Sequence, residues 1–339
     1  MPQQFLVAIG AGLAAALLFF IPVKGTAFAM TIALFASLPL MIAGLAFSPA
    51  AALLGAVAGS LALNLGLVAF TEVSGSAAFV FSLFFAATAA LPAWQLTRLT
   101  WLGRPAEDGE TAGPDGLVWY PMGRLVAWMA GLGAAAAAAG FLFAVARWGS
   151  FDAFVTESAA RLTPMVDAIF SRAGGATGLP GGLTSAELAR AFVLLTAPVT
   201  AGWTVAALAL NLWLAGRIAH VSQRLRRPWQ DVPENLHLPR ALGPLFLVCL
   251  GATLLGGAPL VLGAIGAAAI GVALALKGLA IIHAATRANA ARGLLLALLY
   301  TAMLILFPLP LPLLAAVGLA AVFTAGGRPS PSPPSPKNQ

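Results

Sequence analysis

The chain has 339 residues, of which 60% are hydrophobic and only 9% are charged, whereas a soluble domain carries roughly 25% charged residues. This composition leaves too little polar surface for a water-soluble globule of this length. The net charge of +7 encodes membrane orientation when it lies beside apolar spans, so it does not indicate nucleic-acid binding. A lone cysteine, Cys249, excludes a disulfide framework and a thiolate metal site. We expect an all-α, polytopic membrane helical bundle.

Apolar runs long enough to cross a bilayer recur along residues 1–327, which we expect to form one transmembrane domain. A hydrocarbon core about 30 Å thick requires roughly 20 apolar residues per helix. Runs bounded by charges, Pro or Gly predict nine or ten spans, at 5–22, 27–47, 49–70, 77–96, 122–147, 185–216, 241–256, 258–282 and 293–325. Pro308, Pro310 and Pro312 interrupt the last run. Because proline breaks helices, a hairpin of two short helices, 293–307 and 311–325, is favoured and gives ten spans.

Small residues recur at four-residue spacing on several spans, as in Ala8, Gly12 and Ala16 on the first span. The third span has Ala51, Gly55 and Gly59, and the eighth has Gly263, Ala267 and Gly271. Such residues let helix backbones approach closely, and packing within the bundle is favoured over docking of a partner subunit.

The distribution of Lys and Arg among the loops indicates the orientation. With ten spans and a cytoplasmic N-terminus, twelve of the 18 basic residues lie on the inner side and five on the outer side. Because cytoplasmic loops carry the excess of Lys and Arg, both termini are expected to be cytoplasmic.

Two segments outside the spans have the composition of irregular structure. Residues 97–121 are expected to form a cytoplasmic loop, whose Gly- and Pro-bearing acidic part, 103–118, is flexible and holds no site. The tail 328–339 is dominated by Pro and Ser, cannot bury a core, and is expected to be disordered.

The segment 151–172 is amphipathic and lies on the outer side in this topology. Apolar residues recur there at helical spacing, while Asp152, Glu157 and Arg161 take the other face. We expect Pro164 to split it into two pieces that lie flat at the outer interface. A structural interfacial helix is the simpler interpretation, and a moving lid over an outward-facing cavity is the alternative.

The sixth span, 185–216, is longer than a bilayer crossing requires. Thr184 and Glu187 match a capping box at its start. Pro198 near its middle predicts a kink.

Motifs of membrane-embedded catalysis are missing from the sequence. It has no HExxH pair for zinc, no Asp-rich pair for a metal-bound diphosphate, no phosphate-binding glycine loop and no cysteine pair. The three histidines fall in or beside inner loops, away from a membrane-embedded serine. We therefore expect neither an enzyme nor a cofactor.

A few polar or aromatic residues inside the spans are candidate solute or cavity contacts: Asn64, Trp203, Asn211 and Lys277. Lys277 lies six residues before His283, so its side chain can snorkel to the inner headgroups, or it can contact an anionic solute. Interhelical hydrogen bonding is the default interpretation for both asparagines, and ligand contact is the alternative.

The densest polar cluster is the basic cytoplasmic loop 217–240. Its candidate contact residues are Arg224, Arg226, Arg227 and Trp229. Arginines beside a membrane most simply bind the anionic headgroups of the lipid bilayer, with Trp229 at the interface. A docking site for a cytoplasmic partner subunit is the sharper hypothesis.

Several stretches resemble the YybS-like family of uncharacterised bacterial membrane proteins. They are Leu91–Trp94, Trp119–Leu125, Asn211–Trp213, Arg227–Trp229 and Leu238-Pro239. That family is similar, more distantly, to the substrate-binding S components of energy-coupling-factor vitamin transporters, which are helical bundles with a solute pocket near the outer face. The resemblance implies a bacterial cytoplasmic (inner) membrane location and supplies no catalytic residues. The end of this chain departs from the family, because a Pro/Ser tail replaces an acidic and aromatic segment.

Two functional hypotheses follow. The first is a small-solute, vitamin-like transport component, whose uptake would require a transporter partner subunit or an ion gradient. The second is a non-transporting membrane scaffold or assembly factor, which docks a cytoplasmic partner through the basic loop.

Overall fold

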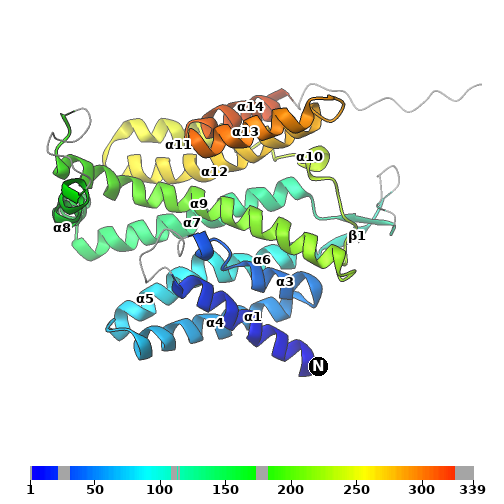
Figure 1. Cartoon of the computed structure of the whole chain (residues 1–339), viewed down its shortest axis with the longest axis horizontal. Helices are drawn as coiled ribbons and strands as arrows, with labels where there is room; N and C mark the ends of the chain where they lie inside the picture. Colours follow the sequence, from blue (N-terminus) through cyan, green and yellow to red (C-terminus); the bar gives the residue numbers. More distant parts are fainter. Residues whose placement is uncertain (1, 22–30, 108–112, 114, 173–181, 325–339) are drawn as a thin grey trace, which may run out of the picture.

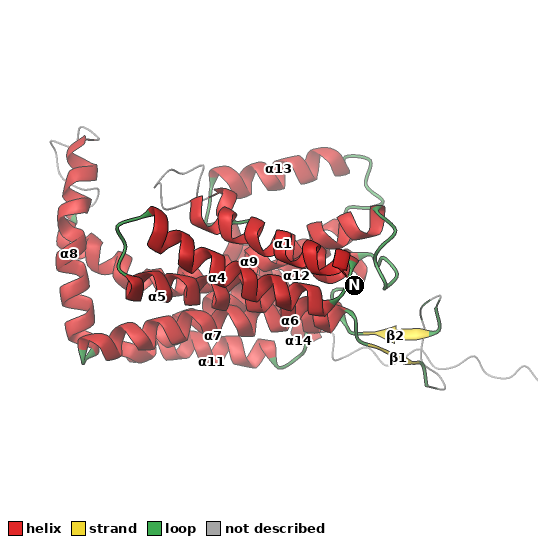
Figure 2. Ribbon diagram, turned by 90° about the horizontal axis from the view of Figure 1, so that it is seen from below, coloured by secondary structure: helices red, strands yellow, loops and turns green. Residues whose placement is uncertain are grey.

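The computed structural model describes residues 2–21, 31–107, 113, 115–172 and 182–324. The structure is 81% helical, which confirms the all-α bundle. Most helices lie side by side along one direction, and one helix lies across an end of the bundle (Figures 1 and 2). The predicted disordered tail 328–339 lies outside the described residues.

Six helical stretches in the described part of the chain are long and apolar enough to cross a membrane. They are Gln3–Phe20, Pro49–Phe70, Gly75–Thr100, Met122–Trp148, Ser185–Val221 and Gly257–Ala285. Four shorter apolar helices accompany them: Thr31–Ala46, Leu242–Leu255, Arg292–Ile305 and Pro310–Thr324. Each predicted span has a helix at its position, and large apolar side chains such as Leu17 and Leu65 point outward. The chain is a multi-pass membrane protein.

The N-terminal half of the bundle contains α1 (Pro2–Phe20), α3 (Leu38–Ala46), α4 (Pro49–Phe70), α5 (Gly75–Phe85) and α6 (Leu91–Thr100). A π-helical turn, Ala86–Ala90, joins α5 to α6. These helices form the lower group in Figure 1. The expectation that small residues pack within the bundle is confirmed between α1 and α4: a Cβ at Gly59 would lie 2.6 Å from the carbonyl oxygen of Gly12.

The second group contains α7 (Met122–Trp148), α9 (Ser185–Val221), α11 (Leu242–Ala252) and α12 (Gly257–Ala285). It is completed by α13 (Arg292–Ile305) and α14 (Pro310–Thr324). The break between α13 and α14 confirms the predicted hairpin. Contacts of α9 with α7, α12 and α3 make it the central helix that joins the two groups.

The predicted cytoplasmic loop 97–121, with its flexible part 103–118, contains regular structure near both ends, so the expectation is wrong there. Residues 97–100 complete α6, and β1 (Gly103–Pro105) pairs with β2 (Leu117–Trp119) as an antiparallel ribbon. The indole of Trp119 donates to Asp115 Oδ2 at 2.8 Å. This bond ties the ribbon to its own turn, which the composition of the segment does not reveal.

The amphipathic segment forms one helix, α8 (Phe151–Arg172), with Pro164 inside it. The predicted split is wrong. Val155 and Val166 of α8 are buried against Ala189 and Val193 of α9, and this burial offsets the roughly 3 kcal/mol that an internal proline costs. Figure 2 shows α8 running across the end of the bundle, the direction expected of an interfacial helix.

The long central helix α9 begins with the predicted capping box, in which Thr184 and Glu187 exchange hydrogen bonds. It continues through the buried Pro198 and ends at Val221, five residues beyond the predicted end. Its last turns therefore reach past the other helices to the end of the bundle opposite α8, where α10 (Val232–Asn235) and the ribbon lie (Figure 1).

Candidate functional site

A cavity of about 640 Å³ lies at the end of the bundle opposite α8. Its walls come from the first turns of α7, the second halves of α9 and α12, and the segment 225–236, with Tyr300 of α13 also contributing. Most of the lining is apolar, as at Met129, Trp213 and Leu276. Cavities of roughly 300–1,000 Å³ with an apolar lining and a few polar groups are typical of small-molecule sites.

The segment 225–236 covers the cavity because the chain reverses immediately after α9. Gln223 has φ of 54°, and the amide of Arg224 donates back to the carbonyl oxygen of Ala219 at 2.8 Å. The short helix α10 then follows Pro228 and carries Pro233 in its first turn. The reversal returns the chain over the end of the bundle.

Trp229 lies at the edge of the cavity, where two side chains from the last turns of α9, an imidazole and a guanidinium, contact its ring. Its ring stacks on His220 with a centroid distance of 5.4 Å. The guanidinium of Arg217 lies 5.5 Å from the same ring. Trp229 is half-buried and forms part of the cavity wall, and its predicted position at the lipid interface stays a prediction.

Arg227 also lines the cavity and is only 8% exposed. It donates to the carbonyl oxygen of Tyr120 at 3.4 Å and to Gln230 Oε1 at 2.7 Å. Burial lowers the pKa of this guanidinium from its ordinary value, because desolvation disfavours the charged form. The side chain is enclosed by the returning segment, so Arg227 does not lie on an exposed surface that could meet the bilayer surface or a docked partner.

The other two candidate arginines of the loop stay exposed. The guanidinium of Arg224 lies 4.8 Å from the ring of Phe47, and that of Arg226 lies 5.1 Å from the ring of Trp101. Both therefore cover aromatic rings on the N-terminal group of helices while their charge remains accessible.

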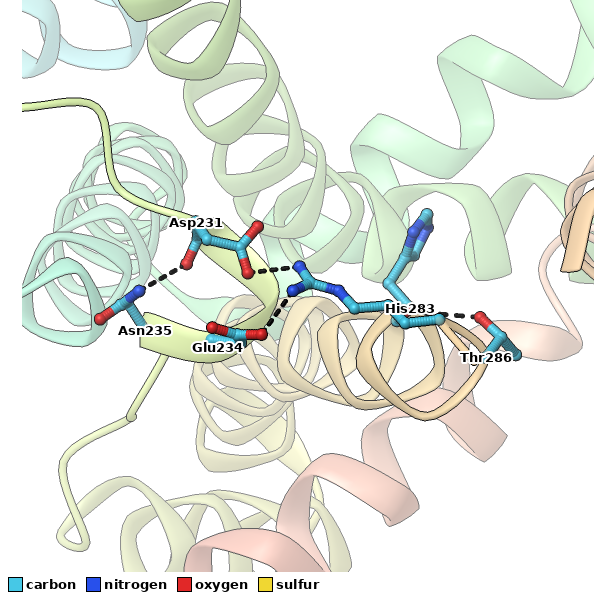
Figure 3. Close-up of polar contacts among 6 residues, drawn as sticks. Asp231, Glu234, Asn235, His283 and Thr286 are labelled. Atoms are coloured by element: carbon cyan, nitrogen blue, oxygen red, sulfur yellow. Dashed lines mark hydrogen bonds and ion pairs between the residues drawn. The ribbon is translucent and has the colours of Figure 1, made fainter. Parts of the chain in front are cut away.

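A second arginine, Arg287, holds the segment 225–236 in place through ion pairs. Arg287 follows the end of α12 and forms ion pairs with two acids. Asp231 immediately precedes α10 and Glu234 lies inside it. Dashed lines in Figure 3 mark both ion pairs at the labelled Asp231 and Glu234. The hydrogen bond to Asp231 raises the pKa of Arg287. Nearby, His283 Nε2 and the Tyr300 hydroxyl lie 2.9 Å apart and join α12 to α13.

The four candidate solute contacts inside the spans do not line this cavity. Trp203 is 52% exposed on the outside of α9. Asn64 and Lys277 are half-buried, and no hydrogen bond or ion pair joins Lys277 to another described residue.

Asn211 is fully buried on α9, where its amide nitrogen donates to the Leu34 carbonyl oxygen at 2.7 Å and to Ser37 Oγ at 2.9 Å. These are interhelical hydrogen bonds, as expected by default from the sequence. The residues between 34 and 37 form turns rather than regular helix, which frees a carbonyl for this bond.

Sequence reasoning missed Gln230, Asp231, Glu234 and Arg287 as parts of one site. The spacing of Asp231 and Glu234 gave a weak signal, because residues three apart share one helix face. Their partner lies more than 50 residues away. Among the described residues, no group of three or more His, Cys, Asp or Glu side chains is arranged to hold a metal ion.

Comparison of the chain with protein-family models, with curated proteins and with solved structures finds no match. The resemblance to the YybS-like family therefore stays a prediction.

Proposed function

We propose that the protein is a small-solute transport component of a bacterial cytoplasmic membrane, and that it binds its solute in the 640 Å³ cavity. The cavity carries the proposal, because its size and mainly apolar lining are those of a small-molecule site. The many apolar helices and the resemblance to vitamin-binding subunits support the same assignment.

We propose that the cavity end faces the cytoplasm, together with both termini, and the excess of basic residues supports this orientation. Arg217, Arg224, Arg226 and Arg287 all lie in the last turns of α9 and α12 or in the segments that follow them, and Lys and Arg accumulate on the cytoplasmic side. The pocket of the vitamin-binding subunits lies near the outer face. The cavity described here would instead expose its solute on the inner side.

Energy for uptake would come from a partner complex or an ion gradient, since the sequence has no nucleotide-binding glycine loop. The exposed Arg224 and Arg226 and the anionic headgroups around them are the surface where we propose that such a subunit binds.

A ligand screen with a cavity-filling variant tests the proposal. The protein in lipid nanodiscs is heated with vitamins and other small organic solutes, because a solute at about 100 times its Kd stabilises the folded state by about 2.7 kcal/mol. We expect a solute that stabilises the wild type but not Ala209→Phe, whose ring would occupy the cavity. Ala207→Phe, on the same helix but away from the lining, is the matched control.

Two results would contradict cavity binding: no stabilisation of the wild type by any solute, or equal stabilisation of Ala209→Phe. A radiolabelled form of the stabilising solute, supplied to liposomes that contain the protein and its partner, then measures transport itself.

A membrane scaffold is the second candidate, and the exposure of Arg224 and Arg226 favours it. If docking is their role, replacing both by Gln abolishes recovery of a crosslinked cytoplasmic partner while solute binding continues. Unchanged recovery would exclude this candidate. Arg227 is omitted from the variant because it is buried.

A further inference from the structure

Arg227 is a buried cation without a countercharge. Its two hydrogen bonds go to neutral acceptors, the Tyr120 carbonyl oxygen and the Gln230 side chain. A guanidinium carries five N–H donors, so these bonds leave donors unused. A buried charge is costly unless an opposite charge and further hydrogen bonds compensate it.

The acids of the same segment do not compensate Arg227. Asp231 and Glu234 lie four and seven residues further along the chain, and both pair with Arg287. Among the residues that the structure describes, no carboxylate forms an ion pair with Arg227. An anion from outside the chain would supply the missing charge.

The rest of the cavity favours an apolar occupant. Met129, Trp213 and Leu276 come from three different helices and face the same space of about 640 Å³. An inorganic anion would leave this apolar lining without contacts. A neutral apolar solute would fill the space but leave Arg227 without a countercharge.

We infer that the cavity takes an amphiphilic anion, whose compact oxyanion headgroup, a carboxylate or a phosphate, pairs with Arg227 while its aliphatic tail fills the apolar lining. The planar guanidinium matches either headgroup through two parallel hydrogen bonds. This inference rests on the proposed solute-binding role of the cavity and specifies the class of solute.

Photolabelling tests the inference. The protein is placed in nanodiscs of zwitterionic phosphatidylcholine and labelled with dodecanoate that carries a diazirine in its tail. Unlabelled dodecanoate, dodecyl phosphate and dodecanol compete with the probe, so the competitors share one tail and differ in headgroup. The variants are Arg227→Gln, Ala209→Phe and the matched control Arg226→Gln, which removes an exposed charge next in sequence.

We expect the label on the lining peptides of α9 and α12, and we expect it to disappear in Ala209→Phe. An anionic competitor should displace the probe roughly tenfold or more better than dodecanol, the factor that one charge-assisted hydrogen bond provides. Comparison of dodecanoate with dodecyl phosphate identifies which headgroup is preferred. Arg227→Gln should lose the preference for the anion, and Arg226→Gln should keep it.

Each contrary result has a separate meaning. Equal competition by dodecanol in the wild type overturns the anionic class while cavity binding stands. A preference for the anion that survives in Arg227→Gln overturns the pairing of the headgroup with Arg227. Label that never reaches the lining peptides, or that persists in Ala209→Phe, overturns cavity binding itself and the inference with it. The wild-type competition is decisive even where Arg227→Gln fails to fold.

Discussion

The contact between α1 and α4 can be tested by making the same change, glycine to alanine, at each of two positions on α1. Gly10 and Gly12 both lie inside α1, two residues apart. A Cβ at Gly10 would meet nothing within 4 Å, whereas a Cβ at Gly12 would overlap the Gly55 carbonyl oxygen and lie 2.9 Å from the Gly59 nitrogen. Carbon atoms pack best at about 3.5–4.0 Å, so Gly12→Ala must push two backbones apart.

The expected difference in the free energy of unfolding follows from two terms. Alanine is the better helix former by about 0.8–1.0 kcal/mol, and this gain applies equally to both variants. Overpacking costs typically about 1–3 kcal/mol and applies only to Gly12→Ala. We therefore expect Gly12→Ala to be about 1–3 kcal/mol less stable than Gly10→Ala.

Reversible unfolding of the purified protein in mixed detergent micelles, followed by circular dichroism, measures this difference. Two variants of equal stability would refute the close approach of α1 and α4. A more stable Gly12→Ala would show that α1 presents a different face to its neighbour.

Two further predictions concern the end of the bundle that holds the cavity. Trp101→Phe removes the hydrogen bond from the indole to the Gly44 carbonyl oxygen, which is 3.0 Å long. This variant should lower the free energy of unfolding by about 1 kcal/mol. Unchanged stability in the same unfolding assay would contradict that contact. Arg287→Gln removes both ion pairs that hold α10, so amide hydrogen exchange in α10 should accelerate. Arg292→Gln is the control, because Arg292 forms no ion pair with another described residue. Equal exchange in both variants would argue against a role of Arg287 in holding α10.

The arginines of the loop after α9 show how tertiary position separates residues that look equivalent in sequence. Arg226 and Arg227 are neighbours, and both are followed by proline or tryptophan within three residues. One covers an aromatic ring and stays exposed, while the other is enclosed in the cavity wall. A docking surface is therefore expected to use Arg224 and Arg226, and solute recognition is expected to use Arg227.

The sequence by itself determined the helical spans, the hairpin at 293–325, the capping box of α9 and the amphipathic character of α8. These features depend on the length of apolar runs, on prolines and on side chains within one turn of each other, which are local properties. The sequence misjudged Pro164 and the ribbon of β1 and β2, because burial against α9 and the bond from Trp119 to Asp115 come from outside the local pattern.

Only the tertiary structure decided where the candidate site lies. The cavity forms because the first turns of α7 and the second halves of α9 and α12 meet under the segment 225–236. The residues that fasten this segment, Arg287 with Asp231 and Glu234, are more than 50 positions apart. No local pattern encodes such a pairing, since it depends on how far α9 extends before the chain reverses. The burial of Arg227 without a countercharge has the same origin.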